Sequence, residues 1–223
     1  MRSVVFGLMA SFMMAVSAIA DELWVAFDLS DSSPLLLEDA AAMRGGVTVA
    51  EAIRSLKRGD TVFLRSFGEA GVSEQQINLT IRLVGNNRPK KVARDVQAFI
   101  ASLPELTRKG TLKLEHRTNV MGWLERAGPT LNCQSTPTRV IALTDGIEWS
   151  GAIRGDQLLS GAPLPPPSGA ILEGCLVEFW GVGQQQKKFG NDDRWYPILR
   201  KSWTAYMADA GAAKFVAYAK YSR

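Results

Sequence analysis

The chain has 223 residues, of which 46% are hydrophobic and 22% are charged. This composition excludes collagen-like, intrinsically disordered and disulfide-dense proteins. The 26 basic and 22 acidic residues leave a net charge of only +4, with no basic cluster beyond Lys90-Lys91 and Lys187-Lys188. Because a nucleic-acid site needs basic residues gathered on one face, we expect no nucleic-acid partner.

The first 20 residues have the layout of a secretory signal. Arg2 precedes an apolar stretch from Val4 to Val16, and Ala18-Ile19-Ala20 places small residues before Asp21. This pattern predicts a cleaved signal peptide at 1–20 and a single mature domain at 21–223. A membrane anchor is the alternative, but the apolar stretch is short for a hydrocarbon core of about 30 Å. We expect an exported protein, periplasmic or extracellular, without a membrane span after cleavage.

In the first third of the mature chain, the pattern predicts a strand, a helix and a second strand. Leu23–Phe27 is a continuous apolar run of the kind that forms a strand buried on both faces. Thr48, with Glu51 three residues later, resembles a capping box and predicts a helix that ends at Gly59. Thr61–Phe67 is the next predicted strand.

The middle third begins with a strand of a different kind. Ile77, Leu79, Ile81 and Leu83 alternate with polar residues, which predicts a half-exposed antiparallel edge strand beside the preceding one. Thr111–Glu115 alternates more weakly. Two helices are expected in this region, one with Pro89 in its first turn and one starting near Val120.

The last third repeats the alternation of strand and helix. Thr138–Leu143 and Cys175–Val182 predict buried strands, Gly151–Gly169 predicts a long proline-rich loop, and an apolar stripe from Trp195 to Met207 predicts a helix. The whole pattern predicts an α/β fold with a doubly wound, mostly parallel sheet, one antiparallel edge strand and helices on both faces.

The two cysteines, Cys133 and Cys175, are expected to form a disulfide, because exported proteins fold in oxidising compartments. Each precedes or opens a predicted strand, so both would lie at the amino end of the sheet if those strands are parallel neighbours. Two buried free thiols are the alternative.

Oxygen-bearing side chains follow the predicted strands, where open α/β sheets bind their ligands. Asp28, Ser30 and Ser32 follow the first strand, Thr118 precedes a helix, and Asp145 follows the strand at 138–143. Carboxylates and hydroxyls in tight turns suit a hard cation such as Mg²⁺, with Mn²⁺ or Ca²⁺ as alternatives. We expect Asp28 to be a surface carboxylate. Ordinary helix caps and turns are the other interpretation of these residues.

At this point the sequence resembles the von Willebrand factor A-like family, whose domains have a Rossmann-like fold. Asp28-Leu29-Ser30-Asp31-Ser32 is similar to that family's metal-ion-dependent adhesion site, Thr118 to its second-loop threonine, and Leu143-Thr144-Asp145-Gly146 to its third-loop aspartate. The resemblance extends from Leu23 to about Gly211. It implies that Ser30, Ser32 and Thr118 bind the metal through their hydroxyls, while Asp28 and Asp145 act directly or through water.

The resemblance implies a non-enzymatic module that binds an acidic group of a protein partner through the metal. The first alternative is a metal-dependent hydrolase acting on phosphoesters, with Asp31 or Glu148 as the base; the second is a scaffold with an empty site. His116 is the sole histidine in the sequence, and there is no Gly-x-Ser-x-Gly motif, so a Ser-His-Asp hydrolase is not expected. Trp149, which follows Asp145 in a loop, is an equal candidate for core packing and for a contact at the rim of the site.

Overall fold

The computed structural model describes residues 21–69, 76–185 and 194–222; the predicted signal segment lies outside them. Within these ranges the chain forms one six-stranded sheet in the order β3-β2-β1-β4-β5-β6. β3 is antiparallel to β2, and the other neighbouring strands are parallel. The strands are β1 (Glu22–Asp28), β2 (Thr61–Phe67), β3 (Asn78–Arg82), β4 (Thr138–Leu143), β5 (Leu176–Trp180) and β6 (Lys214–Tyr218).

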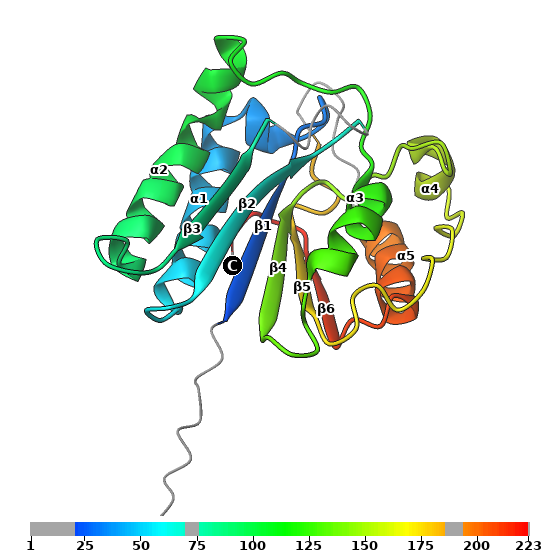
Figure 1. Cartoon of the computed structure of the whole chain (residues 1–223). Helices are drawn as coiled ribbons and strands as arrows, with labels where there is room; N and C mark the ends of the chain where they lie inside the picture. The colour runs from blue at the N-terminus through cyan, green and yellow to red at the C-terminus, as the bar shows by residue number, and fades with distance from the viewer. Residues whose placement is uncertain (1–20, 70–75, 186–193, 223) are drawn as a thin grey trace, which may run out of the picture.

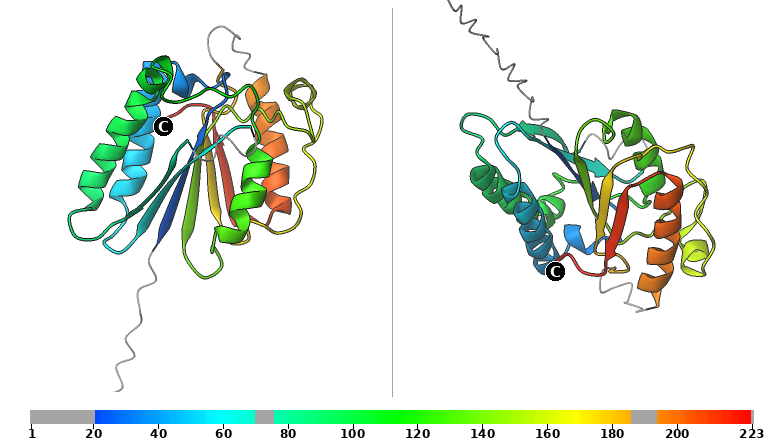
Figure 2. Two further views of the ribbon diagram at one scale, coloured as in Figure 1. Left: turned by 45° about the horizontal axis from the view of Figure 1, so that its top comes forward. Right: turned by 90° about the horizontal axis from the view of Figure 1, so that it is seen from below.

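Helices cover both faces of this sheet, as Figures 1 and 2 show. Helices α1 and α2 pack on one face; α3 and α5 lie over the other, with α4 against α5. The predicted doubly wound, Rossmann-like α/β fold with an antiparallel edge strand is therefore confirmed. The helices are α1 (Asp39–Arg54), α2 (Pro89–Arg108), α3 (Val120–Ala127), α4 (Gly155–Leu159) and α5 (Trp195–Asp209).

The central strand β1 shows why its sequence is apolar without alternation. Leu23, Val25 and Phe27 pack into the core under α1 and α2. Trp24 and Ala26 point to the opposite face and join the core under α3 and α5. Since both faces are buried, every position in the strand favours an apolar side chain.

Both predicted ends of the first helix are wrong, because α1 ends at Arg54 and not at Gly59. Helix α1 begins at Asp39, after a short 3-10 turn at Pro34–Leu36, and no side chain caps it. Thr48 lies in the middle of α1, where its hydroxyl donates a hydrogen bond to the backbone oxygen of Tyr221 at 2.6 Å. The pair Thr48 and Glu51 is therefore not a capping box, and Thr48 instead ties α1 to the end of the chain.

Three further expectations differ from the structure. Thr111–Glu115 is not a strand; within it, Glu115 makes an isolated bridge to Ser30. The predicted loop at 151–169 contains α4, whose first turn is closed by a hydrogen bond from the Arg154 backbone N–H to the Gln157 side chain. Strand β6 was not predicted at all.

The predicted disulfide between Cys133 and Cys175 is present, with the two Cα atoms 5.0 Å apart. Cys133 precedes β4 and Cys175 immediately precedes β5, so the bond joins these neighbouring strands at their amino ends. Its presence agrees with an exported protein, because oxidising compartments retain disulfides. None of the helices in the described ranges is both long enough and apolar enough to span a membrane.

Candidate metal centre

The candidate site lies at the carboxyl ends of β1 and β4, two parallel neighbours at the centre of the sheet. The chain continues from β1 to β2 on one side and from β4 to β5 on the other, so the strand order reverses between them. Open α/β sheets form their ligand crevices at such switch points. Asp28 ends β1, and Asp145 follows two residues after β4.

Asp28 is fully buried, which corrects the expectation of a surface carboxylate. Its Oδ1 accepts a hydrogen bond from the Ser30 backbone N–H at 2.9 Å, and its Oδ2 accepts one from the Thr144 hydroxyl at 2.7 Å. Burial raises the pKa of Asp28, although these hydrogen bonds act in the opposite direction. The carboxyl group is thus fixed in position behind the first loop.

Asp145 is also fully buried and is linked to both serines. Its Oδ2 accepts a hydrogen bond from the Ser32 hydroxyl at 2.6 Å, and the Ser32 Oγ lies 3.1 Å from the Ser30 Oγ. Burial, followed by the nearby charge of Asp28, raises the pKa of Asp145 to about 8. Four of the five predicted residues are therefore connected by hydrogen bonds, with Asp28 joined to the other three through the Ser30 backbone N–H.

Thr118 reaches the same place through backbone contacts. The Glu115 N–H donates to the Leu29 oxygen at 2.9 Å, and the Asp31 N–H donates to the Glu115 oxygen at 2.8 Å, so the segment before α3 lies against the first loop. On the other side, the Trp149 N–H donates to the Thr118 oxygen at 2.8 Å. The N-cap of α3 is Asn119, whose side chain accepts from the Gly122 N–H; Thr118 is therefore not needed as a cap.

The three hydroxyl residues, Ser30, Ser32 and Thr118, line one cavity of about 280 Å³. The two carboxylates lie behind them and are not part of the cavity wall. The structure thus brings all five predicted residues to one location, with the hydroxyls in front and the acids behind. The rest of the lining consists of Asp31, His116, Ile147, Trp149, Gly155, Asp156, Leu159 and Gln185.

Glu148 has a structural role that the sequence did not indicate. It is fully buried, and its Oε2 accepts hydrogen bonds from the backbone N–H groups of Val120 and Met121, at the start of α3. Burial raises its pKa to about 7. Val120 and Met121 directly follow the Thr118-Asn119 segment. Glu148, in the loop after β4, therefore fixes the position of that segment.

The donor set fits a hard divalent cation. Hydroxyl and carboxylate oxygens are the ligands that Mg²⁺ and Ca²⁺ prefer, and two adjacent buried acids with raised pKa values are stabilised as anions by a nearby positive charge. No group of three or more histidine, cysteine, aspartate or glutamate side chains suited to a metal occurs in the described part of the chain. The candidate centre therefore depends on its hydroxyl oxygens.

No protein-family model matches the sequence, and no curated protein matches it either. Similar solved structures include proximal thread matrix protein 1 from the mussel byssus (TM-score 0.44), the pilus adhesin SpaC from Lactobacillus rhamnosus GG (0.48) and the adhesive tip pilin GBS104 from Group B Streptococcus agalactiae (0.34), each 15% identical. They cover 86%, 92% and 63% of this chain, which spans only 48%, 29% and 53% of theirs. Similarity at this level assigns no function to the chain.

Proposed function

We propose that this protein is an exported binding module of the von Willebrand factor A-like type, which holds Mg²⁺ or a similar cation and recognises an acidic group of a protein partner. The observation that carries the proposal is the single cavity lined by Ser30, Ser32 and Thr118 in front of two buried carboxylates. The strand order, with its antiparallel edge strand, agrees with the fold that the sequence resemblance implies.

The arrangement of these oxygens favours binding of an acidic ligand. Neutral hydroxyls would contact the cation directly, whereas Asp28 and Asp145 lie behind them and already accept hydrogen bonds from the protein. A cation held mainly by neutral oxygens keeps much of its positive charge. A carboxylate from a partner is therefore a favourable additional ligand.

The rim of the cavity supplies apolar surface for such a partner. Trp149 is 41% exposed and lines the cavity next to Ile147 and Leu159. The Arg154 guanidinium lies over the Trp149 ring, 5.8 Å from its centroid, and also forms an ion pair with Asp156. An exposed indole in a defined position is typical of residues that contribute strongly to protein–protein binding.

The residues favour binding over hydrolysis. A general base must reach the proton that it removes, but Glu148 is buried and accepts two backbone hydrogen bonds at the start of α3. The half-buried Asp31 carboxylate lies 3.3 Å from the ring nitrogen of the exposed His116, and both residues line the cavity. Glu148 is therefore already used as an acceptor at the start of α3, and Asp31 lies beside His116 at the rim.

Calorimetry with Mg²⁺ and Mn²⁺ tests the metal site. We expect the wild-type protein to bind both ions, and Ser30→Ala and Thr118→Ala to bind them more weakly, because each change removes one neutral ligand. Thr204→Ala, in the exposed face of α5, is the matched control and should bind like the wild type. No heat of binding at millimolar metal in the wild type would contradict the proposal.

Paramagnetic Mn²⁺ tests the partner chemistry separately. A short peptide containing aspartate should displace metal-bound water and reduce the proton relaxation enhancement of the Mn²⁺ complex, whereas the same peptide with asparagine should not. Equal effects of both peptides would contradict recognition of an acidic group. Mn²⁺-dependent turnover of a phosphoester would instead support the hydrolase.

A further inference from the structure

The two edges of the sheet differ in how they are covered. At one edge, the Tyr196 hydroxyl at the start of α5 donates a hydrogen bond to the Ala217 backbone oxygen of β6, at 2.9 Å. The other edge is β3, which in the described part of the chain pairs with β2 alone (Figure 1). Four of its five residues are exposed. Edge strands of this kind accept a further strand unless side chains or loops cover them.

Backbone hydrogen bonds show which groups of β3 face outward. The Ile77 oxygen, just before the strand, and the Leu83 N–H, just after it, bond to residues in β2 or next to it, at 3.0 and 2.8 Å. In an antiparallel pair, residues bonded to the neighbouring strand alternate with residues that bond in the opposite direction. The backbone groups of Asn78, Thr80 and Arg82 therefore point away from β2.

Most of these outward groups are free for another strand. The Arg82 oxygen accepts from the Val84 N–H at 2.9 Å and from the Asn87 side chain at 3.4 Å. Among the described residues, no hydrogen bond is made by the N–H groups of Asn78, Thr80 and Arg82 or by the oxygens of the first two. An added strand would therefore find donors and acceptors along the whole of β3.

An apolar groove of about 470 Å³ lies along this edge, between β3 and α2. Val92 and Val96 of α2 contribute to one side of it, and Leu79 and Ile81 of β3 contribute to the other. Leu79 is 50% exposed, and Val84, which follows the strand and also lines the groove, is 43% exposed. Large apolar side chains that are exposed together over a groove are typical of an interaction surface.

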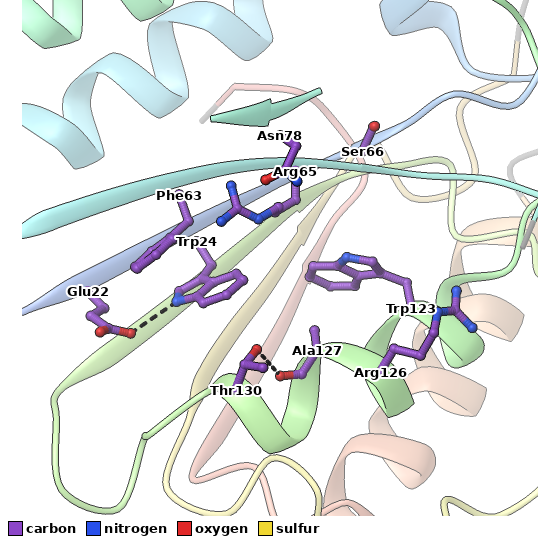
Figure 3. Close-up of a pocket in the computed structure, with 10 residues that line it drawn as sticks. All are labelled: Glu22, Trp24, Phe63, Arg65, Ser66, Asn78, Trp123, Arg126, Ala127 and Thr130. Carbon is purple, nitrogen blue, oxygen red and sulfur yellow. Dashed lines mark hydrogen bonds between the residues drawn. The ribbon is translucent and has the colours of Figure 1, made fainter. Parts of the chain in front are cut away.

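The opposite face of β3 is polar. Figure 3 shows Asn78 beside Arg65, on the face of the sheet where Trp24 and Phe63 lie. The Arg65 guanidinium donates to the Thr80 hydroxyl at 3.0 Å. The alternation along the strand thus separates apolar side chains, over the groove, from polar ones. A strand with the same alternation would continue both faces of the sheet.

We propose that two copies of this protein pair through their β3 strands, antiparallel and with Thr80 at the two-fold axis. In this register, Thr80 lies opposite Thr80 of the second copy, and Asn78 lies opposite Arg82 of the second copy. Leu79 of one copy then lies beside Ile81 of the other on the groove face, and such cross-strand apolar pairs stabilise a sheet. The two-fold axis is perpendicular to the sheet, so both grooves lie on one face and join across the interface.

The sequence of β3 favours a second copy in this register. Arg82 faces the neutral Asn78, so no like charges lie opposite each other. A shift by one residue would set outward-bonding residues against inward-bonding ones, and a shift by two would leave Asn78 or Arg82 without a partner inside the strand. A shift by four would place either the two Arg82 or the two Asn78 side chains together. The whole strand is therefore complementary to itself in one register, and the proposal does not depend on the metal site.

Sedimentation equilibrium of the purified protein tests the pairing. A five-residue strand is only about 17 Å long, and interfaces below about 1,200 Å² belong to weak, transient complexes. We therefore expect a monomer at about 10 μM and a substantial fraction of dimer at about 1 mM, equally with Mg²⁺ and with a chelator. A monomer at the higher concentration would overturn the proposal and leave the edge to a strand of another protein.

Thr80→Pro is the informative variant. It removes the outward N–H at the centre of the interface, and edge strands tolerate proline where the N–H faces solvent. We expect the dimer to weaken by about tenfold or more. Thr80→Ala is the matched control, because it loses the same hydroxyl but keeps the N–H, and it should dimerise like the wild type. Equal dimerisation of these two variants would contradict pairing through the backbone of β3.

Leu79→Lys makes the test independent of the folding of a proline variant. The side chain is half exposed, so its replacement opens no core cavity, and it places a charge beside Ile81 of the second copy. This variant should also weaken the dimer by about tenfold or more. A Leu79→Lys protein that dimerises like the wild type would overturn the proposal.

Cysteine cross-linking tests the register. The two native cysteines are already paired, and residues opposite each other in an antiparallel pair have Cα atoms about 5.5 Å apart, within the range of a disulfide. A mixture of Asn78→Cys and Arg82→Cys proteins should form a disulfide-linked dimer on mild oxidation, whereas either variant alone should not. No cross-link in the mixture, or equal cross-linking by either variant alone, would overturn the proposed register.

Discussion

The two central acids each shape the loop that follows a strand. The Asp28 Oδ1 accepts from the N–H of Ser30, and the Asp145 Oδ1 accepts from the N–H of Ile147, in each case two residues further along the chain. This is the local turn that aspartate favours after a strand. At the candidate site the turn interpretation and the metal interpretation are therefore compatible, because the same turns position the hydroxyls of Ser30 and Ser32.

Asp28→Ala should destabilise the protein. The change leaves the Ser30 N–H and the Thr144 hydroxyl, both buried, without their acceptor. We expect a loss of about 2–4 kcal/mol in the free energy of unfolding, measured by urea denaturation. Asp28→Asn retains the shape and one acceptor oxygen, so its loss should be smaller. Equal stability of Asp28→Ala and the wild type would contradict the buried hydrogen bonds.

The raised pKa values predict how stability depends on pH without metal. A carboxyl group whose pKa is higher in the folded than in the unfolded protein destabilises the fold as it ionises. In the folded protein the pKa of Asp145 is about 8 and that of Glu148 is about 7, whereas both groups ionise near pH 4 in the unfolded chain. The free energy of unfolding therefore decreases as the pH rises between the unfolded and the folded pKa of each group. In the presence of a chelator, the melting temperature should fall from about pH 5 to about pH 8.

Saturating Mg²⁺ should reduce this fall, because the cation stabilises the ionised form of Asp145. Asp145→Asn should reduce it without metal, and Mg²⁺ should then have little further effect. Glu148→Gln is the control, because the Glu148 carboxylate accepts from backbone N–H groups at the start of α3, whereas Asp145 accepts from the Ser32 hydroxyl of the candidate site; the contribution of Glu148 to the slope should be independent of metal. The same slope with and without Mg²⁺ in the wild type would contradict a cation at Asp145.

Sequence patterns predict the bounds of a helix or strand where residues close in the sequence determine them. Strands β2 and β4 have the predicted bounds, because their apolar runs are bounded by turns. The start of α1 could not be found in this way, since no capping side chain marks it and Thr48 bonds instead to Tyr221, far away in sequence. In the five-residue strand β6, Lys214 is exposed, Ala217 is buried and the other three side chains are half-buried, so the sequence has no strong alternation.

Two neighbouring glycines in α1 show how closely α1 and α2 approach. A Cβ atom at Gly46 would lie 3.0 Å from the backbone oxygen of Gln97 in α2, whereas one at Gly45 would lie 3.0 Å from the Leu35 side chain. Alanine is favoured over glycine within a helix by about 1 kcal/mol. At Gly46 this gain in helix propensity is opposed by the close contact with the Gln97 backbone oxygen, which is relieved only if α1 and α2 move apart.

Gly46→Ala should therefore be less stable than Gly45→Ala. At Gly45 a side chain must adjust, and the gain in helix propensity offsets part of that cost. Urea denaturation of the two variants provides the measurement, with the wild type as reference. A Gly46→Ala protein as stable as Gly45→Ala would show that the helices can separate at little cost.

Across the whole molecule, the two ends of the sheet have different roles. The disulfide joins the segments before β4 and β5 at the amino ends of these strands, and the candidate metal centre lies at the carboxyl ends of β1 and β4. Sequence reasoning placed the two cysteines at the amino ends of the strands and Asp28 and Asp145 at the carboxyl ends, because parallel strands bring equivalent ends together. It did not predict that Asp28 and Asp145 are buried, because burial depends on the loops that cover them.

This separation predicts that loss of the disulfide affects stability but not metal binding. The bond links residues 42 positions apart, and a loop of that length contributes about 4 kcal/mol in the chain-entropy model. The double variant Cys133→Ala with Cys175→Ala should unfold at lower urea concentration, by an amount that corresponds to about this free energy. At a temperature where the variant stays folded, its affinity for Mg²⁺ should equal that of the wild type. The same loss of stability together with a loss of metal affinity would show that the two ends of the sheet are coupled, since the β4 backbone runs from one to the other.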